Sequence, residues 1–343
     1  MAIASGFGPH AAWLMVAGGA WPIEHGNVSQ SAERKTSSFS CVIPMAWPGA
    51  RSMFAGLSAG TDASINVMTR GQFGTLITAE VDEVKFDYIP RREIHVTGRD
   101  KSYKLHEQIT SEKWLNKLPS DIVRDLVSRA GIPIGNIASS SVKAGKQLQQ
   151  DYVKLSENNT FGRVIHEMAQ IDGCRWWIDQ NGNFQYVPYG SQNGSYSVTI
   201  NQEVDPISAD CLELHVGHNL QAGRPHEVTV KGWHPKKKEI FSSTSNVEGS
   251  GPPRVWNYQV PTLTPDRAQR HAKSEATEKA RHEFLVTSTV VGDPTVQAGM
   301  GLQINGTDFD QTYDIDAVHH DFGMSGHLTH ITARSPKSGR SAS

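Results

Sequence analysis

Runs that alternate apolar and polar residues dominate residues 13–97, and Gly, Pro and Asp separate one run from the next. The runs are SSFSCVIPM, ASINVMTRG, GTLITAEVDEVKFDYIP and REIHVTG. A repeat of two is typical of strands with one buried face, and the separating residues favour turns. This part of the chain is therefore predicted to form a small antiparallel barrel or sandwich.

Helical spacing replaces the strand pattern near residue 119. In PSDIVRDLVSRAGI, Ser120 is placed to cap a helix and Gly131 to end it. In NNTFGRVIHEMAQIDG, Thr160 and Gly173 take the same two roles. Two strand-like runs follow, CRWWID and NFQYVP, and Asn-Gly between them favours a tight hairpin turn. This region is predicted to be a small α/β module.

Strand patterns return near residue 205, and one long helix interrupts them. The runs are LELHVG, HEVTVKGWHP, KEIFSST, FLVTSTVVG, GLQING, YDIDAVHHDF and HLTHITAR. The helix is predicted in TPDRAQRHAKSEATEKARHEF, with Thr264 as its cap and Pro265 in its first turn. Its stripe of mostly small residues, which would permit close packing, is Ala268, Ala272, Ala276, Ala280 and Phe284.

These patterns together predict a mainly β protein with an α+β insertion. Two barrel-like antiparallel β domains are expected at 1–97 and 201–335, and they flank the small α/β module at 98–200. The second β domain contains the long helix. The C-terminal tail, residues 336–343, is expected to be disordered. Its sequence, PKSGRSAS, has no apolar residue beyond alanine and proline.

Charge and hydropathy limit the classes of partner. The chain has 33 Lys and Arg against 35 Asp and Glu, so contact with nucleic acid or an anionic membrane would need a local patch. Residues 11–20 (AAWLMVAGGA) resemble a signal-peptide core, but no basic residue precedes them. No later apolar run approaches the roughly 20 residues that span a bilayer, so no stable membrane insertion is predicted.

The cysteine pattern favours folding in a reducing compartment. Cys41, Cys174 and Cys211 are far apart and odd in number, which excludes a disulfide framework and a CxxC metal site.

Two short motifs resemble enzyme signatures, but each lacks a required part. Gly56-Leu57-Ser58-Ala59-Gly60 fits the GxSxG pattern, yet a turn and a strand are predicted after it where a nucleophile elbow needs a helix. His166 and Glu167 begin like the zinc-peptidase motif HExxH, but Gln170 stands where the second histidine must be. A small-residue loop and a polar helix face explain these motifs more simply.

Three clusters of charged or histidine residues remain as candidates for binding. His319, His320, His327 and His330 are the best metal candidates by composition, but adjacent strand residues point to opposite faces. A run of acids, Asp308, Asp310, Asp314 and Asp316, lacks the glycine and the glutamate of a calcium loop. Lys236, Lys237 and Lys238 are typical of a charged hairpin turn, with a DNA-facing patch as the alternative. No cofactor or metal site is therefore assigned.

The order of five segments carries a resemblance that no single motif does. The segments are KTSSFSCVIPM; IHVTGRD followed by SDIVRDLVSRAGI; NNTFGRVIHEMAQIDGCRWWIDQNGNFQYVP; HEVTVKGWHP; and ARHEFLVTSTVVGDPTVQAGMGLQINGT leading into YDIDAVHHDFGMSGHLTHITAR. Their succession resembles the baseplate hub proteins of contractile phage tails, the late control protein D family. That family is related to the N-terminal hub part of type VI secretion spike proteins. The resemblance covers about residues 20–335, and residues 1–21 align with nothing in it.

The resemblance implies a structural protein rather than an enzyme. Three copies would form a homotrimer whose six barrel-like domains make a pseudo-sixfold ring. The ring would join the sixfold tail tube, or a tube-initiator protein, to the threefold central spike. It would also contact other baseplate proteins and leave a channel for DNA passage. The implied location is the tail baseplate of a virion, assembled in the host cytoplasm.

Five residues are predicted to act in assembly. Val96-Thr97-Gly98-Arg99-Asp100 is interpreted as the exit from the first β domain, with Gly98 relaxing the strand. Arg99 and Asp100 are expected at this joint, Trp233 as a buried anchor, and Ala272 and Ala276 on a close-packed helix face.

Two other functions stay open at this stage. A tail-associated cell-wall hydrolase would use acids such as Asp308 and Asp314. A carbohydrate-binding protein would use Trp176, Trp177 or Trp256, although the first two point to opposite strand faces.

Overall fold

The computed structural model describes residues 10–112, 114, 117–141, 143, 159–234, 239–259, 265–324 and 326–335. The protein is mainly β, as predicted, with 49% strand and 17% helix. The predicted disordered tail, 336–343, lies outside the described residues. None of the described helices is both long enough and apolar enough to cross a membrane.

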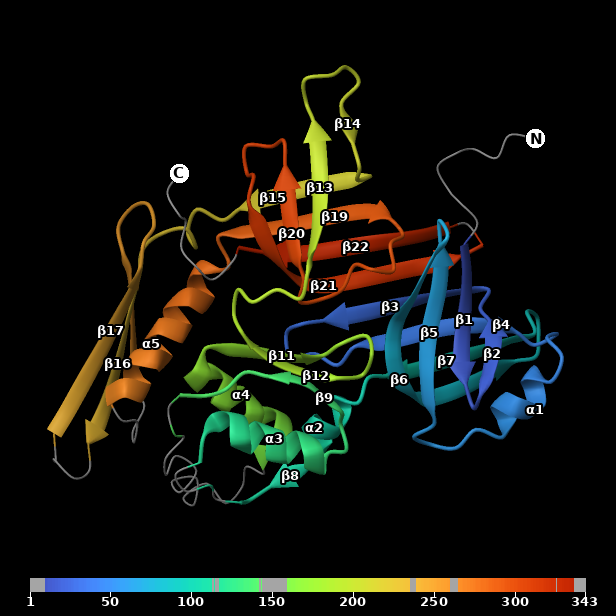
Figure 1. The fold of residues 1–343 in the computed structure, drawn as a ribbon, viewed down its shortest axis with the longest axis horizontal. Coiled ribbons are helices and arrows are strands. Elements are labelled where there is room, and N and C mark those ends of the chain that lie inside the picture. The colour runs from blue at the N-terminus through green and yellow to red at the C-terminus, as the bar shows by residue number, and fades with distance from the viewer. Residues whose placement is uncertain are drawn as a thin grey trace.

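The first seven strands form one antiparallel group, on the right in Figure 1. They are β1 (His10–Val16), β2 (Gly19–Pro22), β3 (His25–Ser31), β4 (Ser38–Pro44), β5 (Asp62–Thr69), β6 (Gln72–Asp87) and β7 (Glu93–Arg99). Alternate residues fill their core, as the period of two requires; on β7, Ile94 and Val96 are fully buried. The β structure predicted from the alternating pattern is therefore confirmed in this part of the chain.

The second strand group lies above the α/β module in Figure 1. It comprises β13 (Ser195–Asn201), β14 (Ser208–Ala209), β15 (Glu213–His218), β19 (Phe284–Val291), β20 (Gly301–Asn305), β21 (Thr312–Gly323) and β22 (Gly326–Arg334). Its core is separate from that of the first group and centres on residues such as Val286, Ile315 and Ile331.

Both strand groups belong to one 14-stranded sheet. They are joined by antiparallel pairing of β3 with β21, from Ala317 opposite Ser31 to Gly323 opposite His25. Phe322 of β21 packs in the core of the first group, which strengthens the connection. The hydrogen-bonded path ends at β2 and at β14, so the described strands do not close into a barrel.

The α/β module has its own core beneath the second strand group. Its elements are α2 (Tyr103–Glu107), β8 (Ile109–Thr110), α3 (Pro119–Arg129), β9 (Ile134–Ile137), β10 (Asn159–Thr160), α4 (Phe161–Asp172), β11 (Cys174–Ile178) and β12 (Phe184–Pro188). The predicted apolar faces of α3 and α4 are buried. Thr160 caps α4 by accepting a hydrogen bond from Arg163 N, and Gly173 ends it at φ 66°, as predicted.

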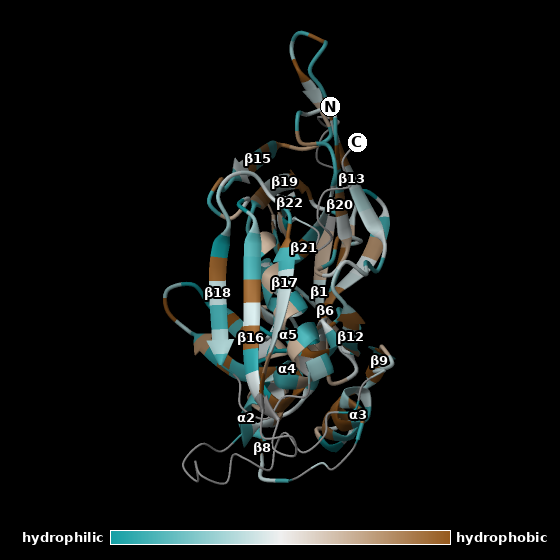
Figure 2. Ribbon diagram, turned by 90° about the vertical axis from the view of Figure 1, so that its left-hand side faces the viewer, coloured by the Kyte–Doolittle hydropathy of each residue, from teal (hydrophilic) through white to brown (hydrophobic). Residues whose placement is uncertain are grey.

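A third unit interrupts the second strand group. The strands β16 (His226–His234), β17 (Glu239–Val247) and β18 (Arg254–Gln259) form a sheet of their own, covered on one side by α5 (Pro265–Ala280). β16 and β18 face the viewer in Figure 2, and they carry mostly polar residues with single apolar ones between them. The predicted cap of α5, Thr264, lies outside the described residues.

Three local features differ from the sequence predictions. A short helix, α1 (Ala50–Ala55), lies where strands and turns were expected. Ser120 does not cap α3, because the helix begins at Pro119 with Leu118 before it. Arg254–Gln259 is the strand β18, although no strand was predicted there. The hairpin β1–β2 lies within the predicted first β domain, although the resemblance did not align residues 1–21.

Candidate functional site

The stretch predicted as the exit from the first β domain, residues 96–100, belongs to β7 as far as Arg99, where the strand ends. A bulge in β6 leaves Asp82 without a strand partner, because the register moves from Val81 opposite Gly98 to Glu83 opposite Thr97. Arg99 donates to both carboxylate oxygens of Asp82, at 2.6 Å and 3.1 Å. Its guanidinium also lies 4.8 Å from the centre of the Tyr103 ring. The partly exposed Arg99 side chain therefore links the bulge of β6 to the helix α2.

Asp100 is buried next to this ion pair, and only 1% of its surface is exposed. Its carboxylate accepts hydrogen bonds from the backbone N–H groups of Ser37 at 2.7 Å and Ser102 at 2.8 Å. Burial raises the pKa of the Asp100 carboxyl, and these hydrogen bonds partly oppose the rise. Asp100 thus connects the loop before β4 to the start of the α/β module.

Gly98 has a different role from the predicted relaxation of the strand, since β7 continues past it. A Cβ atom at this position would lie 2.3 Å from the Glu80 carbonyl oxygen and 2.4 Å from the Phe39 ring. Glycine is needed here because the neighbouring strand and the aromatic ring approach the backbone too closely for a side chain.

Glu80 completes the joint and was not found by sequence reasoning. It is 4% exposed and accepts hydrogen bonds from the Tyr103 hydroxyl and from Lys104 Nζ, each at 2.6 Å. Burial, followed by the contact with Glu80, raises the pKa of Tyr103 to about 12. The pattern in β6 gave no signal for Glu80, because its partners come from α2.

The other predicted assembly residues lie in the third unit. Ala272 and Ala276 are fully buried against the sheet formed by β16, β17 and β18, together with Val228 and Val230 of β16. The close packing expected from the alanine stripe is therefore made within the chain. Trp233 belongs to β16, opposite Ile240, but its side chain is outside the described part of the structure. A role for these residues in assembly stays a prediction.

A partly buried charge cluster joins the loop after β3, the residue that follows α5, and strands β21 and β22. Arg281, 1% exposed, donates to Glu33 Oε1 at 2.9 Å and to the Asp316 carboxylate. Arg334 donates to the same Glu33 oxygen at 2.8 Å and lies 3.3 Å from Asp316 Oδ2. The Tyr189 ring covers the Arg281 guanidinium at 5.6 Å. We call Glu33, Arg281, Asp316 and Arg334 the charge cluster.

The environments of the two acids in the charge cluster differ. Burial raises the pKa of Asp316 to about 6, against attraction from Arg281 and Arg334. Burial also acts to raise the pKa of Glu33, but attraction from Arg334 and Arg281 outweighs this effect and leaves the pKa below its usual value. The cluster holds charges in place between units.

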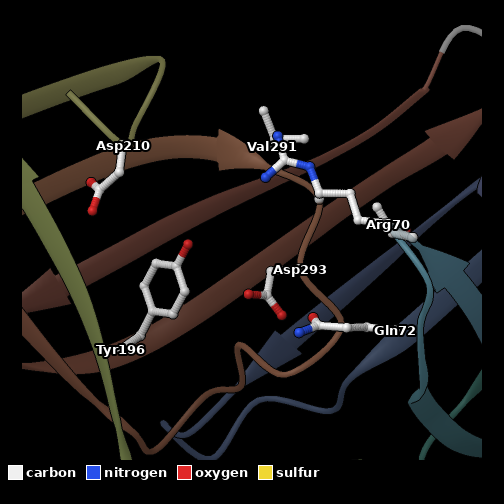
Figure 3. A pocket seen from close by; sticks show the side chains of 8 residues that line it. Arg70, Gln72, Tyr196, Asp210, Val291 and Asp293 are labelled. Carbon is white, nitrogen blue, oxygen red and sulfur yellow. The ribbon is translucent and has the colours of Figure 1, made fainter. Parts of the chain in front are cut away.

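A small polar cavity lies where the two strand groups meet (Figure 3). Its volume is about 170 Å³, and Figure 3 shows the side chains of Arg70, Tyr196 and Asp293 around it. Burial and then the carboxylates of Asp293 and Asp210 raise the pKa of Tyr196 to about 12, so its hydroxyl stays protonated at neutral pH. At roughly 30 Å³ for each water molecule, the cavity has room for a few waters.

The serine and the acids considered for enzyme chemistry lie in differing settings. Ser58 is in an exposed turn between α1 and β5, where its carbonyl accepts a hydrogen bond from the Thr61 side chain. Of the two acids considered for hydrolysis, Asp308 is exposed and Asp314 is fully buried, with Gln192 donating to it at 3.1 Å. Asp310 accepts hydrogen bonds from Gly306 N and Thr307 N and so stabilises a turn. Lys236, Lys237 and Lys238 lie outside the described residues.

The four histidines divide between the two faces of the sheet, as the strand geometry predicted. His320 and His327 are buried, with 3.1 Å between Nδ1 of the first and Nε2 of the second. Burial lowers the pKa of His320 to about 3. His319 and His330 lie on the other face and flank Asp321, at 3.2 Å and 3.4 Å. The four side chains therefore do not converge on one point.

The tryptophans considered for carbohydrate binding are mostly covered. Trp176 is 1% exposed and Trp177 is 3% exposed, so neither presents a ring to a ligand. Trp256 is partly buried, with Lys279 Nζ at 5.0 Å and the Arg254 guanidinium carbon at 5.5 Å from its ring centre. These two cations lie over the Trp256 ring, where a sugar would otherwise stack.

Comparison with solved structures finds the same fold in phage tail proteins. A tail protein from Neisseria meningitidis shares 15% identity at a TM-score of 0.70, over 96% of this chain and 97% of that one. A 43 kDa tail protein of prophage MuSo2 from Shewanella oneidensis shares 15% identity at a TM-score of 0.71, over 96% and 99% of the two chains.

The fold extends to a type VI secretion component. That E. coli protein, which itself resembles the bacteriophage T4 tail proteins gp27 and gp5, shares 9% identity at a TM-score of 0.54. The match covers 96% of this chain and 79% of that chain. By sequence, the chain matches no protein-family model and no curated protein. The resemblance to tail hub proteins is thus confirmed at the level of the fold, which this chain shares along nearly its whole length.

Proposed function

We propose that this protein is the structural hub of a phage tail baseplate. The observation that carries the proposal is the fold shared with two tail proteins along 96% of the chain. A match over 96% of the chain extends across both strand groups, the α/β module and the third unit. We assign the protein no catalytic step.

In this proposal three copies form a ring by symmetry matching. Each copy supplies two strand groups, so that three copies present six β units to a sixfold tail tube and three copies of every other feature to a threefold spike. The pairing of β3 with β21 supports this arrangement, because it fixes the two strand groups of one chain in a single sheet. We propose the domain division 1–97, 98–200 and 201–335 to within a few residues, since β7 ends at Arg99 and β13 begins at Ser195.

The partners follow from the position of such a ring. We propose contacts with a tail tube or tube-initiator protein, with the central spike and with other baseplate proteins, and a channel that DNA crosses during ejection. Assembly would occur in the host cytoplasm and the final location would be the virion. The segment around β14 projects from the body in Figure 1 and exposes Val204, Ile207 and Leu212, which suits a protein contact.

Among the residues predicted for assembly, Arg99 is the one we propose as a direct contact with a neighbouring copy. Its side chain is 44% exposed, although it is already paired with Asp82. Asp100, Ala272 and Ala276 are buried within the chain, so we propose that they support the surface from inside.

Light scattering on the purified full-length protein, alone and with a candidate spike protein, tests the proposal. A mass three times that of the 37.6 kDa chain is expected, either alone or when the spike is added. A chain that stays monomeric in both measurements would contradict the hub assignment.

A further inference from the structure

Two carboxylates and one imidazole gather where the β6–β7 hairpin closes; the two strands lie side by side in the first strand group (Figure 1). Asp87 is the last residue of β6, and Glu93 and His95 belong to β7. One ligand atom from each side chain lies within 4.8 Å of the other two. The sequence analysis assigned no metal site and did not single out these residues.

Strand geometry explains why the three side chains share a face. Ile94 and Val96 of β7 point into the core, so Glu93 and His95 point away from it. Asp87 is directly opposite Glu93 in the antiparallel register. Residues directly opposite on one face of a sheet have Cβ atoms about 5 Å apart, so the two carboxylates are held together by the backbone.

Among the described residues, His95 is the one basic side chain in ion-pair contact with either carboxylate, with its Nε2 atom 3.5 Å from Glu93 Oε2. Like charges directly opposite each other destabilise a sheet. Lys85 is opposite His95, and Arg91 and Arg92 lie in the turn, yet within the described part of the chain none of them forms an ion pair with Asp87 or Glu93. No lysine or arginine in direct contact therefore neutralises the two facing carboxylates within the described residues.

Glu93 gives a second and independent indication of a ligand. The residue is 8% exposed, and its Oε2 atom is buried without a hydrogen-bond partner among the described residues. This oxygen points toward the cluster, with His95 Nε2 at 3.5 Å. Buried carboxylate oxygens normally accept hydrogen bonds or coordinate metals.

We propose that Asp87, Glu93 and His95 bind a divalent cation of the Zn²⁺ class. One imidazole nitrogen and two carboxylate oxygens are ligands that Zn²⁺ accepts, and three protein ligands leave a fourth position for water. Ca²⁺ fits less well because it takes six to eight oxygen ligands. The bound ion neutralises the opposed carboxylates and ties the end of β6 to the start of β7. The site does not depend on the hub function.

His319, Asp321 and His330 provide a matched control elsewhere on the sheet. Both histidines contact Asp321, but the three ligand atoms do not come as close together, and the Asp321 side chain is 49% exposed. Loss of His330 therefore tests whether any surface histidine near an acid accounts for zinc binding.

The experiment measures Zn²⁺ affinity of the full-length protein, after removal of metal by a chelator, in competition with a chromophoric chelator. Glu93→Gln and His95→Gln are compared with His330→Gln. We expect both site variants to bind Zn²⁺ at least about 100-fold more weakly than the wild type, since loss of a group that merely supports a ligand costs about 10- to 100-fold. His330→Gln should retain wild-type affinity.

Thermal unfolding separates a metal site from a structural network. Zn²⁺ should raise the melting temperature of the wild type and of His330→Gln, and it should leave that of Glu93→Gln unchanged. Without metal, Glu93→Gln should melt no lower than the wild type, because it removes one of two opposed charges. Two results would overturn the proposal: no effect of Zn²⁺ on the wild type, as expected if the carboxylates share a proton, or wild-type zinc affinity in Glu93→Gln.

Discussion

Two charged junctions hold the units of this molecule together, and they accommodate buried charge in opposite ways. At the first, the Asp100 carboxylate is stabilised by the backbone N–H groups of Ser37 and Ser102. At the second, Arg281 and Arg334 surround the acids of the charge cluster. The first junction satisfies a charge with backbone dipoles, and the second satisfies it with opposite charges.

The difference determines what each junction loses on mutation. Removing one side chain from the first junction leaves neutral N–H groups unpaired, which costs a moderate amount of free energy. Removing a cation from the second leaves a carboxylate buried without its counter-charge, which costs more. The charge cluster also joins three segments of the fold, so its loss should affect the whole molecule.

Arg281→Met should have the largest effect. The variant retains apolar volume but leaves Asp316 without its main partner, and we expect the free energy of unfolding to fall by about 3–5 kcal/mol. Urea unfolding measures the change, and Arg124→Met, at an exposed position on α3, is the control. A loss as small as that of the control would show that the cluster contributes little.

A pH series should isolate the contribution of Asp316 in the charge cluster. Because the pKa of Asp316 is raised to about 6, above its usual value, the native state holds this proton more tightly than the unfolded state. The resulting stabilisation is complete below the unfolded pKa and is lost as pH rises through 6. We therefore expect the stability of the wild type relative to Asp316→Asn to fall between pH 4 and pH 7. A difference that rises over this range would contradict the assignment.

Asp100→Asn should have an intermediate effect. The new amide places an N–H group against one of the two backbone donors, and we expect a loss of about 1–3 kcal/mol in the free energy of unfolding. Asp121→Asn, at an exposed position, is the control. Equal stability of the two variants would show that Asp100 does not hold the joint.

Gly98→Ala tests the close approach of strands at the same joint. The added Cβ would meet the Glu80 backbone and the Phe39 ring, and such overpacking costs about 1–3 kcal/mol. Gly217→Ala is the matched control, because its nearest contact would be an ordinary 3.6 Å. Denaturant unfolding of both variants should show the loss in Gly98→Ala alone.

Arg99→Ala should have the smallest effect on the isolated chain. Its pair with Asp82 is partly exposed, and exposed pairs contribute at most about 1 kcal/mol. If Arg99 also contacts a neighbouring copy, as proposed, the variant should weaken oligomerisation more than it weakens folding. Sedimentation at several protein concentrations, beside urea unfolding, separates the two effects; equal or smaller loss of assembly would remove Arg99 from the interface.

Local chemistry was the part of the fold that the sequence predicted best. The alternation in β4, β5, β6 and β7, the apolar faces of α3 and α4, and the cap at Thr160 each depend on neighbouring residues. The helix α1 was missed because its six residues are too few to show a clear period. β18 was missed because its alternating positions are largely exposed, which weakens the hydrophobic signal.

The sites that depend on distant segments were not predictable in this way. The charge cluster brings Glu33 together with Arg281 and Arg334, which lie 248 and 301 residues further along the chain. The alanine stripe did indicate close packing, but it could not show that the packed surface is β16 and β17 of the same chain. Asp87, Glu93 and His95 come together through strand register, which needed the pairing of β6 with β7.

Electron microscopy of the purified assembly tests the central claim most directly. We predict projections of a ring with threefold symmetry, in which six similar densities surround a central opening, formed by the protein alone or with the spike. Particles with two copies, or with more than three, would contradict the account. So would a chain that forms no ring in the presence of its spike and tube partners.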